Sequence, residues 1–467
     1  MSGIGVRTAV ALLLAALPAA AQSRKKEAAP PWTLPYLGGR GQVAGREIFV
    51  DGHRMTLEKA VKTAKGGDTI LLGDGLHRVQ GTSGKEFFLG PPGLGPDRMT
   101  VFKAAPKARP IITGPDGGPP WVRVKGDYIR LEGLWIGGRW ESENGESPKG
   151  GQVILGGGGR LDSVREVVGC TFFGLDSVCS SALEFLFFQD NRLVRVGNAV
   201  RDDGGSMLYV SADHGPGWQS QHAIIDRNLF VVGRGYAVIG WHSWHNLLMT
   251  RNVVANAWGG VIVDGPGAAG IGKHPGSDNL IANNLFWKCS RHPGAALIAR
   301  NTHCVGNVFA NAYVNKSEKG EDRWDGLKLQ VTDNAFLAAE RTFHTPGGRE
   351  IRLRKGQEAL EIGAPEQVVD GLVEALNKAF AQPVEALHKD KTVEPLFARL
   401  RAVAPPPGSP LKDAMPAWFD PRRASNVGPA VEYPFKLPND FWARFHARGL
   451  SSWSRTGDPL PAAKEMR

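Results

Sequence analysis

Histidine, aspartate and basic residues recur at the ends of short apolar segments in the middle of the chain. In chain order these residues are Asp213 and His214, His242 and His245, Asp264, and Arg300. Histidine titrates near neutrality and serves as a general base or general acid. Arginine supplies a fixed positive charge that stabilises a developing anion. The set predicts proton-transfer chemistry on a substrate that carries or develops negative charge.

Two long insertions flank these positions, at about 201–221 and 265–277. They contribute Trp218 in the first and Lys273 and His274 in the second, and Trp244 lies close by in the sequence. Loops on a rigid scaffold often form the walls of a binding groove, so we expect these four residues to bind substrate. Asp202 and Asp203 precede two glycines, and the pair is consistent with a plain turn or with a calcium ligand. No metal ligand set is otherwise predicted.

Each of these residues also has a purely structural interpretation. His242 and His245 can decorate a solvent face, Asp264 precedes Gly265–Pro266 and suits a turn, and Arg300 can pair with a neighbouring carboxylate. Asp213 and Asp264 can alternatively form the paired carboxylates of a glycoside hydrolase, in which case their separation decides the chemistry. The sequence leaves these alternatives open.

The scaffold for these residues is indicated by a repeat. A pattern of two or three apolar residues, then Asn-x-(Phe, Val or Leu), then a polar or glycine stretch occurs seven times, with Cys170 in place of the first asparagine. Successive spacings are 21, 37, 24, 32, 23 and 27 residues. The motifs are Cys170–Phe172, Asn191–Leu193, Asn228–Phe230, Asn252–Val254, Asn284–Phe286, Asn307–Phe309 and Asn334–Phe336. A unit of about 22 residues holds three short strands and three turns, which is one coil of a parallel β-helix. We expect the asparagines to form a structural ladder at one corner, not a ligand set.

Both ends of such a solenoid require a cover. Thr56 is a suitable N-cap for a short amphipathic helix that Gly66–Gly67 ends, followed by a strand at Thr69–Leu72. A second helix is predicted at 365–380. The expected organisation is a signal peptide at 1–21, a linker at 22–44, the β-helix at 45–345, a helical insertion at 346–390, and a final irregular coil and tail at 391–467, with aromatics from Pro434 packing over the outside.

The composition and the N-terminal segment limit the possible fold class, location and partner of the protein. Gly 60 and Pro 32 in 467 residues argue against a helical bundle, and the formal charge of +10 either favours a polyanion or only aids solubility. Arg7, an apolar stretch and Ala19–Ala21 form a secretory signal. We therefore expect a protein that is secreted to the periplasm or to the extracellular space, is a monomer and has no membrane span. We expect its partner to be an acidic polysaccharide and not nucleic acid.

The four cysteines are too few for a disulfide scaffold and lack metal-binding spacing. The pairs Cys170–Cys179 and Cys289–Cys304 can form bridges, or all four residues can be packed thiols.

The segments Leu57–Gly75, Val101–Pro106, Pro110–Gly114 and Gly126–Gly137 resemble the first coils of secreted right-handed parallel β-helix proteins of the pectin-lyase-like superfamily. They are similar in particular to the alginate lyase and chondroitinase B type of polysaccharide lyase. The resemblance implies an all-β fold, a single-stranded right-handed parallel β-helix with an N-terminal capping helix and a mixed C-terminal extension. It also implies cleavage of a uronate-containing polysaccharide by β-elimination.

The resemblance does not extend to the family's catalytic residues. The family uses a lysine, an arginine and calcium-binding glutamates, whereas His242 stands in the lysine's place and Asp264 in the arginine's. Gly235 and Ala237 stand where the glutamates belong, and neither binds metal. We therefore predict no firm cofactor, with calcium left open. The function expected first is a polysaccharide lyase, and the alternatives are a glycoside hydrolase and a non-catalytic glycan-binding β-helix of the cell surface or matrix.

Overall fold

The computed structural model describes residues 45–403. Its gaps are 82–84, 96–97, 140–149, 157–163, 182–184, 198–205, 212–221, 242–246, 264–276, 290–293, 298–299, 306, 311, 313, 316–329, 333–334, 338–342, 345–349 and 352–365. The predicted signal peptide, linker and C-terminal tail lie outside this part of the chain.

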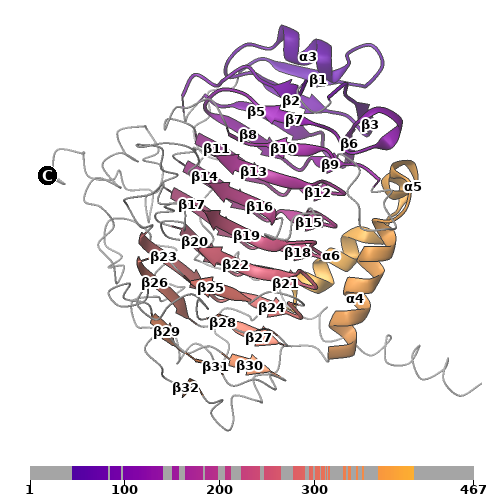
Figure 1. The fold of residues 1–467 in the computed structure, drawn as a ribbon. Helices are drawn as coiled ribbons and strands as arrows, with labels where there is room; N and C mark the ends of the chain where they lie inside the picture. Colours follow the sequence, from indigo (N-terminus) through magenta and orange to yellow (C-terminus); the bar gives the residue numbers. More distant parts are fainter. Residues whose placement is uncertain are drawn as a thin grey trace, which may run out of the picture.

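Three long parallel sheets build the molecule, and from β2 to β27 each strand pairs with the strand three places further along the chain (Figure 1). The eleven-stranded sheet consists of β1 (Glu47–Val50), β2 (Thr69–Leu72), β5 (Thr100–Ala104), β8 (Ile129–Glu132), β11 (Val164–Val168), β14 (Phe185–Gln189), β17 (His222–Asp226), β20 (Leu247–Thr250), β23 (Ser277–Ala282), β26 (Arg300–Val305) and β29 (Gln330–Thr332).

The ten-stranded sheet consists of β3 (Gly75–Arg78), β6 (Pro110–Thr113), β9 (Trp135–Gly137), β12 (Thr171–Phe173), β15 (Arg192–Val194), β18 (Leu229–Val231), β21 (Val253–Ala255), β24 (Leu285–Trp287), β27 (Val308–Ala310) and β30 (Ala335–Leu337). The nine-stranded sheet consists of β4 (Phe87–Leu89), β7 (Val122–Val124), β10 (Gln152–Ile154), β13 (Ser177–Ser181), β16 (Ser206–Ser211), β19 (Tyr236–Trp241), β22 (Gly259–Val263), β25 (Ala295–Leu297) and β28 (Val314–Asn315). A pair of antiparallel strands, β31 (Phe343–His344) and β32 (Glu350–Ile351), and the 3-10 turn η2 (Pro115–Gly117) complete the non-helical elements.

This architecture is a parallel β-helix, as the sequence predicted. The spacings between the sequence motifs are the register of the ten-stranded sheet: Thr171 pairs with Arg192, 21 residues later, and Arg192 pairs with Leu229, 37 residues later. The longer coils contain the predicted insertions, and the strands on either side of each insertion keep the same pairing.

The asparagine ladder is confirmed over five coils. The backbone N–H groups of Asn191, Asn228, Asn252 and Asn284 each donate to the side-chain oxygen of the next asparagine, at 2.8–3.0 Å. These residues and Asn307 are fully buried. Left-handed residues precede four of the asparagines and turn the chain sharply between two sheets, namely Asp190, Arg227, Arg251 and Asn283. Asn334 lies outside the described residues.

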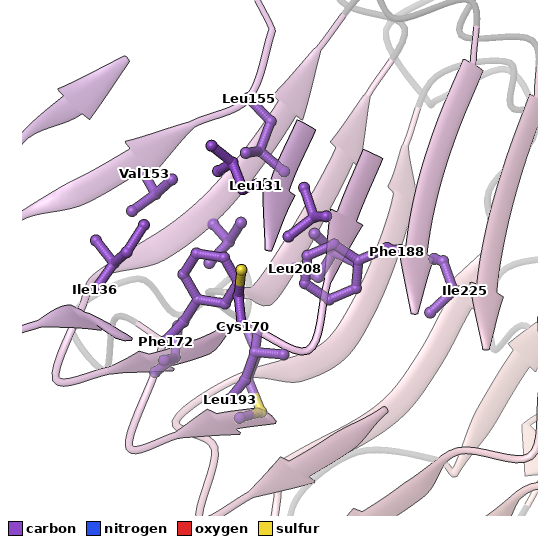
Figure 2. Packing of buried hydrophobic residues seen from close by; sticks show 14 of the residues in the cluster. Leu131, Ile136, Val153, Leu155, Cys170, Phe172, Phe188, Leu193, Leu208 and Ile225 are labelled. Carbon is purple, nitrogen blue, oxygen red and sulfur yellow. The ribbon is translucent and has the colours of Figure 1, made fainter. Parts of the chain in front are cut away.

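The interior of the solenoid is filled by apolar side chains from all three sheets. Figure 2 shows residues of the cluster meeting in this space, among them Val153, Phe172 and Phe188. Phe172 stacks on Phe188 with ring centroids 5.9 Å apart, and Phe286 stacks on Phe309 at 4.8 Å. Each fully buried phenylalanine contributes roughly 1.5–3 kcal/mol relative to exposure.

Three of the four cysteines belong to this interior. Cys170, Cys289 and Cys304 are buried, and burial raises the pKa of each thiol to about 12. All four cysteines are free. Of the two alternatives that the sequence left open, packed thiols are therefore correct and the bridges are not.

The N-terminal cap matches the sequence prediction. Helix α3 (Leu57–Thr63) begins after Thr56, whose hydroxyl accepts the N–H of Lys59 at 3.3 Å. Leu57 and Ala60 enter the interior cluster, so the helix covers the apolar end of the first coil.

The C-terminal helices lie along the outer face of the ten-stranded sheet (Figure 1). They are α4 (Glu366–Ala379), α5 (Val384–Lys389) and α6 (Val393–Arg401). The helix expected at 365–380 is thus confirmed. Helix α6, however, continues the helical region beyond the predicted limit at 390. It accommodates Pro395 in its first turn, where a missing N–H costs no intrahelical bond.

Aromatic and ionic contacts fix these helices to the sheet. Phe380 stacks on Trp135 at 5.8 Å between ring centroids. The Arg109 guanidinium lies 4.7 Å from the centre of the Trp135 ring and donates to the carbonyls of Leu387, His388 and Asp390 at the end of α5. Because the carbonyls at a helix end lack intrahelical partners, this arginine both caps α5 and anchors it.

Candidate active site

The predicted catalytic residues follow three neighbouring strands of the nine-stranded sheet. Strand β16 ends at Ser211, β19 at Trp241 and β22 at Val263, and the pairs Ser211–Trp241 and Gly240–Val263 are in register. Parallel neighbours lie about 4.8 Å apart. The chain therefore leaves one edge of the sheet at three adjacent points.

The side chains predicted to act there belong to the segments that follow these strand ends. Asp213, His214, Trp218, His242, Trp244, His245, Asp264, Lys273 and His274 all lie outside the described residues. Their roles remain predictions.

The sequence pattern predicts Arg300 on the same strand column as Asp213, His242 and Asp264, on the next coil, and this expectation is wrong. Arg300 is the first residue of β26 and pairs with Ser277 in the eleven-stranded sheet. Only residues 298 and 299 separate β25 of the nine-stranded sheet from β26 of the eleven-stranded sheet. Arg300 therefore belongs to the eleven-stranded sheet. On the column itself, Val263 pairs with Leu297.

The outer face of the nine-stranded sheet leads to these strand ends. One outward column runs along the sheet through Phe88, Arg123, Ile154, Cys179, Tyr209, Ile239 and Ile262. Near its start, Phe88 is 42% exposed and the Lys125 ammonium lies 5.2 Å from the centre of its ring. Arg123 is held by Glu86 at 3.0 Å.

A small polar cluster occupies the same face and was not predicted. Gln152 donates through Nε2 to the Ser177 hydroxyl at 2.7 Å and to Cys179 Sγ at 2.9 Å, and Ser177 Oγ lies 3.1 Å from Cys179 Sγ. The signal in the sequence is the alternation around buried Val178, which places Ser177 and Cys179 on the other face. These groups can hydrogen-bond hydroxyls of a ligand lying on the sheet.

Calcium binding through the family's positions is not supported. Ala237 is fully buried in the apolar interior and carries no oxygen ligand, and Gly235 has no side chain. Within the ranges that the structure describes, no group of three or more His, Cys, Asp or Glu side chains is arranged to hold a metal ion. The Asp202–Asp203 pair lies outside them.

Among the described helices, none has the length and hydropathy needed to cross a bilayer.

Comparisons with known proteins return structures only. No protein-family model and no curated protein matches the chain. Similar solved structures include the PL6 family alginate lyase AlyGC, at 14% identity over 63% of this chain and 44% of that one, with a TM-score of 0.35. The chain thus spans less than half the length of that lyase.

Two further similar structures cover more of their own length. An alginate lyase from Paenibacillus sp. str. FPU-7 is 16% identical over 56% of this chain and 94% of that one, with a TM-score of 0.37. Pectate lyase Pel9A is 15% identical over 66% and 82%, with a TM-score of 0.33. At these scores the parallel β-helix assignment rests on the strand pairing of this chain itself.

Proposed function

We propose that the chain is an exported polysaccharide lyase that cleaves a uronate-containing polysaccharide by β-elimination. The observation that supports this most directly is the register of β16, β19 and β22 at their last residues. Each strand leads into a segment that carries a histidine or an aspartate. Because the three strand ends are about one strand spacing apart, these segments start within reach of a single sugar unit.

The residues divide into the roles that β-elimination requires. His242 removes the C5 proton, the C–H electrons form the C4=C5 double bond, and the C4–O bond breaks. His214 or His245 gives a proton to the departing oxygen. Lys273 neutralises the uronate carboxylate as charge develops. Arg300 remains a candidate for this last role only if the substrate extends towards the eleven-stranded sheet.

Asp213 and Asp264 support a second candidate, an inverting glycoside hydrolase. They follow β16 and β22, which lie on either side of β19 and hence about 10 Å apart. An inverting hydrolase holds its two carboxyl groups ~6.5–9.5 Å apart, and the spacing of the two strands leaves room for that separation. In a lyase, the same aspartates would orient the histidines by accepting a ring N–H.

The activity test separates these candidates by their products. The mature protein is incubated with alginate, pectate, glycosaminoglycans and neutral glycans, and both ultraviolet absorbance and reducing ends are followed. Absorbance from the C4=C5 bond supports the lyase, whereas reducing ends without absorbance support the hydrolase. Binding without either signal would leave a glycan-binding protein and refute both enzymes.

His242→Ala tests the site assignment. We expect it to lower kcat by about 10²–10⁴, the usual contribution of a general base. His53→Ala is the matched control, because His53 is an exposed histidine at the N-terminal end of the solenoid, several coils from β16, β19 and β22. Equal activity of the two variants would remove His242 from the mechanism. N-terminal sequencing of the exported protein tests cleavage before Gln22.

A further inference from the structure

The outer face of the eleven-stranded sheet is buried along most of its length. Residues on this face alternate with those of the interior cluster. The buried members are Val101, Arg130, Glu166, Val168, Phe187, Gln189, Asp226, Thr250 and Ala282, all of them at most 6% exposed. These nine residues define what is here named the covered face.

The covered face begins only after the first strands. Phe49 of β1 points outward from the same sheet and is 53% exposed, whereas Phe187 of β14 is 5% exposed. The described helices lie elsewhere, with α3 at the N-terminal end and α4, α5 and α6 on the ten-stranded sheet (Figure 1). A segment other than these helices must therefore exclude water from the covered face.

The covered face combines paired polar side chains with apolar side chains that a cover keeps from water. Its charged members are paired among themselves or with neighbours, since Arg130 contacts Glu166 at 3.0 Å and Asp226 accepts from Thr250 at 2.9 Å. Val101, Val168, Phe187 and Ala282 remain as apolar surface. A cover with aromatic side chains would remove the most water from such a surface.

The last described helix ends beside this face. Arg401 of α6 donates to the backbone carbonyl of Asp190 at 3.2 Å and pairs with its carboxylate at 3.4 Å. Asp190 directly follows β14, at the corner between the ten-stranded and eleven-stranded sheets. Val403, two residues further, is 3% exposed. The chain thus leaves α6 at the edge of the covered face.

We propose that the C-terminal segment 404–467 is the cover of this face. It is rich in aromatic residues, namely Trp418, Phe419, Tyr433, Phe435, Phe441, Trp442, Phe445 and Trp453. Eleven strands at ~4.8 Å extend over about 50 Å, a distance that roughly 15 extended residues span. The segment is therefore long enough to follow the whole sheet, and it starts at the correct corner.

Photo-crosslinking in the full-length protein tests which segment lies on the covered face. A benzophenone amino acid replaces Ile224, which is partly buried on β17 next to Phe187, and the matched probe replaces Phe88 on the nine-stranded sheet. We expect most crosslinks from position 224 to fall within 404–467, and few from position 88. Crosslinks from position 224 to 212–221, to 264–276 or to a second, isotope-labelled copy would overturn the proposal.

A pair of substitutions tests the same contact by a second route. Phe187→Asp places a charge under the cover, whereas Phe49→Asp changes the same residue type on the same sheet where it is exposed. We expect Phe187→Asp to increase protease cleavage within 404–467 while α4–α6 stay protected, and Phe49→Asp to have no effect. Equal cleavage of 404–467 in both variants would refute the proposal, and the crosslinks decide the matter if Phe187→Asp fails to fold.

Discussion

Replacing Asn252 by alanine should break the asparagine ladder at its middle. Asn252 Oδ1 accepts the backbone N–H of Asn228 at 2.8 Å and its side-chain Nδ2 at 2.9 Å. Asn252 Nδ2 donates to the carbonyls of Ile225 and Thr250 and to Asn284 Oδ1, each at 2.9 Å. All three asparagines are fully buried, so no water replaces these bonds at the corner.

The expected loss follows from the groups left behind by Asn252→Ala. The N–H of Asn228 becomes a buried donor without an acceptor, at ~1–3 kcal/mol, and the two bonds to carbonyls contribute about 1 kcal/mol each. Asn228 Nδ2 keeps its bond to the Phe188 carbonyl at 2.8 Å and adds little. We expect the free energy of unfolding to fall by about 3–5 kcal/mol.

Guanidinium unfolding followed by circular dichroism measures this change. Asn256→Gly is the matched control, because Asn256 lies four residues later, is exposed, and has a φ of 52° that glycine adopts freely. We expect the control to change stability by less than about 0.5 kcal/mol. A midpoint for Asn252→Ala no lower than that of the control would show that the ladder does not hold the coils together.

Three further outcomes are expected. Phe380→Ala, which removes the stack on Trp135, should lower stability by about 3–5 kcal/mol and speed hydrogen exchange in α4–α6 but not in the sheets; uniform exchange would refute separate docking. Burial lowers the pKa of His77 despite its bond to the Gly73 carbonyl and the nearby Asp51 and Asp74. The contribution of the neutral His77 side chain to stability is therefore complete above pH about 6.5 and is lost as the pH falls through the lower folded-state pKa. His77→Gln should flatten the fall in the unfolding midpoint over this pH range. An unchanged slope would show that His77 is not the group that titrates. A thiol reagent should modify Cys179 in the native protein, whereas denaturation should be needed for Cys170, Cys289 and Cys304; labelling of any of the latter three without denaturant would contradict their burial.

The fold could be predicted because its corners constrain residue type more tightly than its strands do. A left-handed residue followed by a buried asparagine stands at the turn from the eleven-stranded to the ten-stranded sheet in four successive coils, at Asn191, Asn228, Asn252 and Asn284. The Asn228 and Asn252 motifs therefore remain visible although insertions change the coil length. The cap at Thr56 was equally predictable, because the side-chain oxygen, the apolar spacing and the terminating glycines are all local in sequence.

The position of Arg300 could not be predicted by the same reasoning. Its assignment to a column depended on the length of the turn after β25, and that turn is shorter than those after β16, β19 and β22. Residues 298 and 299 are Ile and Ala, and they include no Gly, Pro, Asn or Asp that would mark a change of sheet. The polar cluster of Gln152, Ser177 and Cys179 was missed for a related reason: alternation shows which residues point outward, but not which of them meet across neighbouring strands.

The three outer faces of the solenoid differ in what covers them, and this difference bears on where a ligand can lie. The ten-stranded face is apolar, with Trp135 and Phe173 under the C-terminal helices. The eleven-stranded face is buried beyond its first strands and, on the proposal above, lies under 404–467. The nine-stranded face carries the hydrogen-bonded cluster of Gln152, Ser177 and Cys179, and Phe88 nearer its start is 42% exposed. A sugar polymer needs both polar partners and an accessible ring surface, so the face that leads to His242 and Asp264 is also the face whose chemistry suits one.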